Sequence, residues 1–255
     1  DDKFAELAKE SIIFETKFGP TQDINKEIDN HTLIKKDEKY FTTISNYKER
    51  NKVFDDKKII YCTDEISQSN PLNLWLSNNR EVLKADPLID AQFIPWLESK
   101  NEDFQFQRVD SEISEDKNED QPEIVDKDGK SNADYLKEII TSALDNEKVT
   151  VKLQSIKSDD APPALILLPE QMRRISDMGA FMEQKLPGLP EYHVLLINKE
   201  HPLISGLKNL SNKKILLKGK ENVEDLLSKK IVTHIYEMAK LSVGGMDQKD
   251  LHNLQ

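Results

Sequence analysis

The residue types that usually carry catalysis are dispersed along this sequence. Its five histidines lie far apart, and none has a second ligand at the spacing that a zinc site needs. The one cysteine, Cys62, stands in an apolar run, where a thiol is more often a packing group than a nucleophile. There is no glycine-flanked serine and no glycine-rich phosphate loop. The carboxylate pairs Asp55-Asp56 and Asp159-Asp160 are typical of solvated loops. We therefore expect no catalytic residue, no metal site and no tight nucleotide binding.

The chemistry that the sequence does favour is the binding of apolar surface. Leu165–Leu189 contains a predicted helix that starts near Pro169, with Arg173 and Arg174 expected opposite its apolar stripe. Methionine is unbranched and polarizable, and it is over-used on surfaces that accept varied partners. The same stripe is also typical of an ordinary helix laid on a core, so both interpretations stay open. The candidate binding residues on this stripe are Met172, Ile175, Met178, Phe181 and Met182.

The composition excludes several classes of protein. The chain has 255 residues, of which 33% are charged and 37% hydrophobic, with a formal net charge of -11. That charge argues against a nucleic-acid partner and against an anionic membrane surface. No apolar run approaches the roughly 20 residues that span a bilayer, and no signal-peptide pattern opens the sequence. A single cysteine favours a reducing compartment, so we expect a cytoplasmic protein. The opening residues Asp1-Asp2-Lys3 suggest a segment of a longer protein.

The first part of the chain predicts a small α/β domain, residues 1–110. Residues 1–30 are expected to form helical pieces, and Thr43–Phe54 a polar helix. Beyond them, short apolar runs alternate with helical patterns, which favours a parallel sheet with helices on both faces, a small three-layer arrangement. The three expected strands are Lys58–Thr63, Glu81–Ala85 and Phe104–Val109, and the helices between them are Ile66–Ser77 and Pro87–Lys100.

The second part predicts an α+β dimerisation domain, residues 131–255, ending in a helical bundle. Residues 111–130 are acidic and poor in apolar groups, so we interpret them as a solvated linker. Expected strands are Val149–Ile156, Ala164–Leu168 and His193–Asn198, and the longest expected helix is Asn222–Ser242. A short final helix is expected at Met246–Leu254. The heptad-like stripe of the long helix, continued in the final one, predicts these dimer-interface residues: Leu227, Ile231, Ile235, Met238 and Leu251.

Several segments, in this order, resemble one known family. They are KKIIYCTDE (Lys57–Glu65), EVLKADPLIDAQFIPWLESKNE (Glu81–Glu102), FQRVD (Phe106–Asp110) and MGAFMEQKLPGLPEYHVLLINKEHPLI (Met178–Ile204). They look like the end of the middle domain and the carboxy-terminal domain of the ninety-kilodalton heat-shock chaperones, in their bacterial form, the HtpG proteins. The resemblance covers nearly the whole chain and is weakest over the first fifty residues.

The resemblance implies an ATP-dependent molecular chaperone of the stress response. Family members are homodimers held by a carboxy-terminal helical bundle, and their ATP and Mg sites lie in an amino-terminal domain, so this fragment is expected to need no cofactor and to lack ATPase activity. Their carboxy-terminal amphipathic helix binds partly folded client proteins, at positions that Met178, Phe181 and Met182 match; Met172 and Ile175 extend the stripe by periodicity. The family also uses the helix matching Pro87–Lys100 for clients, although Gln92 and Pro95 depart from the family pattern. The alternatives are a purely structural dimerisation fragment with the Met-rich helix in its core, and an α/β enzyme.

Overall fold

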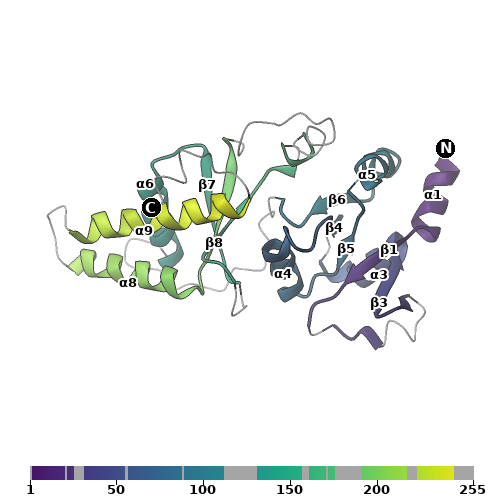
Figure 1. Cartoon of the computed structure of the whole chain (residues 1–255), viewed down its shortest axis with the longest axis horizontal. Coiled ribbons are helices and arrows are strands. Elements are labelled where there is room, and N and C mark those ends of the chain that lie inside the picture. Colours follow the sequence, from purple (N-terminus) through teal and green to yellow (C-terminus); the bar gives the residue numbers. More distant parts are fainter. Residues whose placement is uncertain are drawn as a thin grey trace. The chain divides into compact units, whose positions relative to one another are not determined.

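The structure is a computed structural model of the chain, and it describes most but not all residues (Figure 1). The described ranges are 2–20, 22–25, 32–54, 57–87, 89–111, 131–156, 161–170, 172–175, 191–216 and 223–243. The chain forms two compact units, the first of residues 1–111 with 174–185 and the second of residues 112–173 with 186–255. Most of the expected linker 111–130 lies outside the described residues, as do Leu251 and the rest of the expected final helix.

A six-stranded mixed sheet organises the first unit. Its strand order is β2-β3-β1-β5-β4-β6, and β4 pairs in parallel with both β5 and β6. These parallel strands confirm the three predicted from apolar runs. Their bounds are Lys58–Cys62 for β4, Val82–Lys84 for β5 and Gln105–Arg108 for β6.

The other half of this sheet is antiparallel and was not predicted. The strands are β1 (Ile13–Lys17), β2 (Ile34–Lys36) and β3 (Lys39–Thr43). The prediction of helical pieces over residues 1–30 is right for α1 (Asp2–Ser11) and wrong for β1. The physical reason is a change of period at Ile13, because burial then alternates residue by residue as it does on a sheet with one covered face.

The hairpin between β2 and β3 is closed by a two-residue turn. Asp37 and Glu38 both have positive φ, 48° and 64°, and Lys36 pairs with Lys39 directly across them. This is the backbone of a type I′ turn, whose twist suits adjacent antiparallel strands. Asp is among the residues that accept such a conformation at modest cost.

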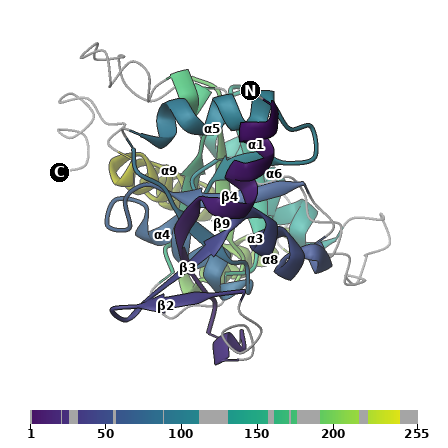
Figure 2. The same cartoon turned by 90° about the vertical axis from the view of Figure 1, so that its right-hand side faces the viewer.

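Helices pack on the two faces of the first sheet. One face carries an apolar core that joins Phe14, Tyr61 and Phe106 to side chains of α1, α3 and α5. On the other face Ile60 and Val82 are buried, and α4 lies on this side of the strands, as Figure 2 shows. Pro95 lies inside α5. The bounds of these helices are Ile44–Arg50 for α3, Ser69–Ser77 for α4 and Asp90–Ser99 for α5, with a short 3-10 helix at Lys52–Phe54.

A three-stranded sheet organises the second unit. Its order is β7-β9-β8, with β9 parallel to β7 and antiparallel to β8. The strands, all predicted, are Val149–Gln154 for β7, Ala164–Leu167 for β8 and His193–Asn198 for β9. The helices are Asn132–Leu144 for α6, Pro202–Leu216 for α8 and Val223–Ser242 for α9. Ser131 begins α6 with a capping box, since its hydroxyl accepts from the Asp134 N–H while the Asp134 carboxylate accepts from the Ser131 N–H.

Candidate functional site

The described part of the methionine stripe is exposed. Residues 172–175 are helical, and Met172 and Ile175 are three residues apart, which places them on one side of the helix. Their exposed fractions are 39% and 55%. Met178, Phe181 and Met182 lie outside the described residues. The structure therefore shows an open apolar surface for two of the five candidate binding residues.

The polar side of the same helical turn is the buried one. Arg173 is only 1% exposed, and its guanidinium pairs with the carboxylate of Glu170. Arg174 donates to both carboxylate oxygens of Glu98, at 2.6 and 2.9 Å, and to the Phe106 carbonyl oxygen at 3.1 Å. The sequence places both arginines opposite the apolar stripe, and the structure adds that their side is the one that meets the protein. A guanidinium tolerates burial when carboxylate and carbonyl oxygens accept its protons, and its aliphatic stem packs like an apolar side chain.

Helix α9 carries apolar residues on two adjacent sides. Val232, Ile235 and Ala239 are buried in the core of the second unit, against α6 and the sheet. Leu227 and Met238, on the neighbouring side, are 45% and 49% exposed, and two further leucines, Leu226 and Leu241, are exposed with them. A helix with apolar groups over so much of its circumference is typical of one covered from more than one direction.

The predicted interface residues therefore fall into different environments. Ile235 already packs inside the protomer, and Ile231 is partly buried against the same core. Leu227 and Met238 are open, and Leu251 lies outside the described residues. Any surface that α9 offers to a second copy is thus formed by its exposed leucines and Met238 rather than by Ile235.

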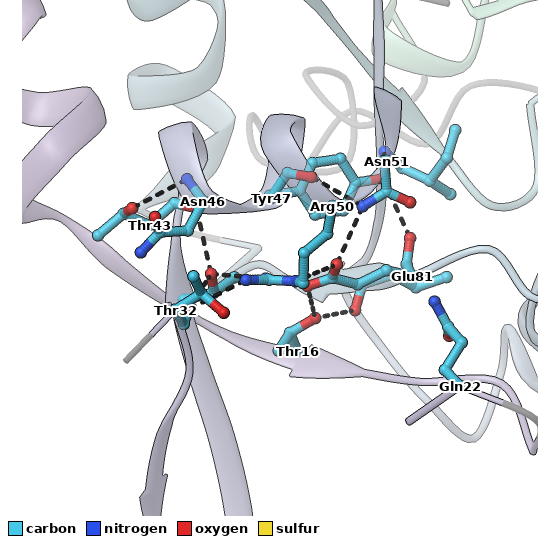
Figure 3. Close-up of polar contacts among 12 residues, drawn as sticks. Thr16, Gln22, Thr32, Thr43, Asn46, Tyr47, Arg50, Asn51 and Glu81 are labelled. Carbon is cyan, nitrogen blue, oxygen red and sulfur yellow. Dashed lines mark hydrogen bonds and ion pairs between the residues drawn. The ribbon is translucent and has the colours of Figure 1, made fainter. Parts of the chain in front are cut away.

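A buried polar cluster in the first unit went unrecognised in the sequence (Figure 3). The Glu81 carboxylate is fully buried and accepts from Arg50 twice, Nε to Oε2 at 3.0 Å and Nη2 to Oε1 at 2.7 Å. Thr16 Oγ1 donates to the same carboxylate at 2.8 Å and Asn51 Nδ2 at 2.9 Å. Arg50 also donates to the Thr32 carbonyl oxygen, which fastens the chain just before β2. The two charged residues are 31 positions apart, so no local pattern could have paired them.

The Tyr47 hydroxyl connects two strands in the same region. It donates to the Glu81 carbonyl oxygen at 3.0 Å and accepts from the Ile60 N–H at 3.0 Å. Tyr47 is buried in α3, and its phenol thus links the middle of β4 to the residue that precedes β5. This side chain satisfies two backbone groups of neighbouring strands at once.

This cluster connects segments of the first unit and thereby stabilises its fold; it is not arranged as a reactive site. Burial raises the pKa of Glu81, whereas the hydrogen bonds from Arg50, Thr16 and Asn51 act in the opposite direction. These donors come from β1 and from the end of α3, so the carboxylate connects those two elements. Cys62 is similarly unsuited to chemistry, since burial raises the pKa of its thiol to about 11, with the charge of Glu65 adding to the effect.

The described residues contain neither a metal-binding cluster nor a membrane-spanning helix. No group of three His, Cys, Asp or Glu side chains there could hold a metal ion. Within the same ranges no helix has the length and apolarity to cross a bilayer.

Comparison with known proteins gives one assignment. The family model described as Hsp90 protein matches residues 4–253, which is nearly the entire chain. The sequence has no match among curated proteins.

Proposed function

Because the chain belongs to the Hsp90 protein family, we propose that it is the client-binding and dimer-forming part of a molecular chaperone of the bacterial HtpG type. The family match over residues 4–253 is the observation that carries this proposal. Its work is the reversible binding of protein surface, because the described residues offer open apolar groups and no reactive constellation.

The client surface in this proposal is the helical stripe that begins at Met172. The exposure of Met172 and Ile175 supports it, as does the use of the opposite, arginine-bearing side for contacts with the protein itself. A protein that leaves such groups wet gives up the free energy of burying them, roughly 1.5–3 kcal/mol for a full side chain. An intermittent partner is the usual reason for keeping them exposed. Met178, Phe181 and Met182 extend this surface in the proposal.

The dimer in this proposal forms through the exposed side of α9. Leu227 and Met238 are separated by eleven residues, three turns of helix, so they lie on one line along it. A two-fold interface contains each residue twice, which doubles the apolar area that this line contributes. Proteins of the family are generally ATPases, and we expect their ATP to bind outside residues 1–255, since this sequence has no phosphate-binding loop.

The client surface is tested by replacing its two described residues. Met172→Ser with Ile175→Ser should leave the melting temperature nearly unchanged, because both side chains are already exposed. The same pair should weaken the suppression of aggregation of a heat-denatured reporter protein, measured by light scattering. A matched control replaces two other exposed apolar residues, Val53→Ser with Ile66→Ser, which should change neither quantity.

The structural alternative gives the opposite result. If the stripe were core, the Met172/Ile175 double variant would melt at a much lower temperature than the control pair. Full retention of aggregation suppression by a stable variant would place the client surface elsewhere.

A further inference from the structure

The six-stranded sheet is covered unequally on its two faces. One face packs against α1, α3 and α5, and its core includes β1 residue Phe14 as well as β6 residue Phe106. On the opposite face α4 lies over the β5-β4-β6 half, where Ile60, Cys62 and Val82 are buried. Over the β2-β3-β1 half of that face, the described side chains are exposed or only partly buried.

The strand register places three apolar side chains together on this uncovered half. Ile34 pairs with Phe41, and Phe41 pairs in turn with Glu15, so these residues form one row across three strands. Ile13 lies two residues from Glu15 on the same face of β1. Ile34 is 51% and Ile13 49% exposed, and Phe41 is partly buried. We call the half formed by Ile13, Ile34 and Phe41 the open sheet face.

Lysines border the open sheet face. Lys36 pairs with Lys39 across the hairpin, and Lys17 continues their row on β1, one register step beyond the pair of Thr16 and Tyr40. This row runs beside the apolar row, two residues further along the strands. Lys84, on β5, lies at the end of the apolar row, where it pairs with Glu15 in the register.

Glu15 is more buried than the two lysines that contact it, whereas Glu65 is about as exposed as its partners. Lys39 Nζ is 3.0 Å from the Glu15 carboxylate, yet its side chain is 52% exposed whereas that of Glu15 is 12% exposed. Lys17 contacts both Glu15 and Glu65, at 3.2 and 3.1 Å, and Lys84 contacts Glu65 at 2.8 Å. Two carboxylates thus serve three ammonium groups, and Lys36 is exposed beside them. On β2 and β3 the exposed charges beside the apolar row are therefore Lys36 and Lys39, although Asp37 and Glu38 add negative charge at the tip of the turn.

We propose that the open sheet face is a docking site for an amphipathic helix of a partner protein, with acidic residues flanking its apolar side. The apolar centre and the exposed lysines beside it are complementary to such a helix in apolar character and in charge. A helix at this position would complete, beside α4, the layer that the described helices supply over half of the face. A helix with its own apolar stripe has more to gain from covering Ile13 and Ile34 than a nucleic acid has.

The face is a better site than the edge of the sheet. β2 is the outer strand, as Figure 2 shows, and an outer strand can recruit an extended peptide. It has only three residues and includes Lys35 and Lys36, features that discourage strand addition. The apolar surface points out of the sheet plane, where a helix can cover it.

The test uses the full chain and two designed helical peptides as probes. Both peptides carry the same leucine stripe, flanked by glutamates in one and by lysines in the other, and fluorescence anisotropy measures their affinity. The glutamate-flanked peptide should bind at least about tenfold more tightly, with an affinity that falls as salt is added. Ile13→Ser with Ile34→Ser should weaken its binding by a similar factor. Lys36→Glu with Lys39→Glu should do the same while leaving the apolar row intact.

Controls separate this site from the proposed client surface. Val53→Ser with Ile66→Ser and Met172→Ser with Ile175→Ser should both retain the peptide affinity, since these residues lie outside the open sheet face. Circular dichroism confirms that each variant is folded, and the lysine variant tests the proposal even if the isoleucine variant unfolds. Equal binding of the two peptides, or unchanged affinity in the folded lysine variant, would overturn the proposal.

Discussion

Both units of this chain have an apolar core, but among the described residues only the first is seen to add a buried ion-pair network to it at its sheet. The ion pair, Arg50 with Glu81, lies at the centre of hydrogen bonds that reach β1, β3 and the end of α3. The sheet of the second unit packs against a core of apolar side chains, and β8 is buried along its whole length. The stability of a buried polar network depends on a few specific contacts. The stability of an apolar core depends on how well its volume is filled, so it tolerates small changes of side chain.

The chain provides a way to observe one interior alone. Its two tryptophans, Trp75 and Trp96, both lie in the first unit. Tryptophan fluorescence therefore follows the unfolding of that unit, while far-UV circular dichroism follows the helices and strands of both. The stability predictions below compare these two signals or follow the tryptophan signal alone.

The largest effect is expected for Glu81→Gln. The change keeps the size of the side chain but leaves the Arg50 guanidinium buried without its counter-charge, which typically costs about 3–5 kcal/mol. The tryptophan transition should move to lower denaturant, and the transition of the second unit should stay. Glu49→Gln is the matched control, because the Glu49–Lys52 pair is largely exposed and should contribute at most about 0.5 kcal/mol. Equal effects of the two variants would remove the contrast between the interiors.

A smaller effect, confined to the other unit, is expected for Ile235→Ala. Ile235 is 5% exposed in the second core, and truncating a buried isoleucine costs about 2–5 kcal/mol. The tryptophan signal should be unaffected. The companion variant, Leu227→Asp with Met238→Asp, changes exposed positions on the same helix, so it should leave the protomer folded and shift sedimentation towards the monomer. A stable dimer in this variant would place the interface away from α9.

The smallest effect is expected from acid. Hydrogen bonding to Lys84 lowers the pKa of Glu65 below its ordinary value of 4.5, against the opposing effect of partial burial, and Lys17 adds to the lowering. A carboxylate with a lowered pKa in the fold contributes stability that is present above about pH 4.5 and is lost as the pH falls through the folded value. The first unit should therefore lose stability on acidification through this range, followed by tryptophan fluorescence. Lys84→Met should flatten that dependence, and an unchanged slope would exclude the Glu65–Lys84 pair as its source.

The sequence predicted best those elements that one local pattern determines. β4, β8 and β9 are short, nearly continuous apolar runs, and each was located to within a few residues. β2 and β3 were missed because they are half exposed and rich in lysine, so neither hydrophobicity nor alternation distinguishes them from loops. Their strand character follows from pairing: β3 pairs with β1, a distant segment, and β2 pairs in turn with β3.

The candidate surfaces show the same limit. Periodicity located the stripe that includes Met172 and Ile175, but it could not tell which side of the helix meets the protein. The side that meets the protein is determined by contacts of the arginines with residues far away in the sequence, such as that of Arg174 with Glu98. For α9, periodicity identified the apolar residues without separating the buried Ile235 from the exposed Leu227.

The Tyr47 hydroxyl couples the packing of α3 to two neighbouring strands of the sheet. Ile60 in the middle of β4 and Glu81, the residue before β5, are joined through this phenol, which belongs to a helix that precedes both strands in the chain. The docking of α3 is therefore coupled to the positions of β4 and β5. We predict that local opening of α3 also releases amide protons of the sheet, that of Ile60 among them, to exchange with solvent.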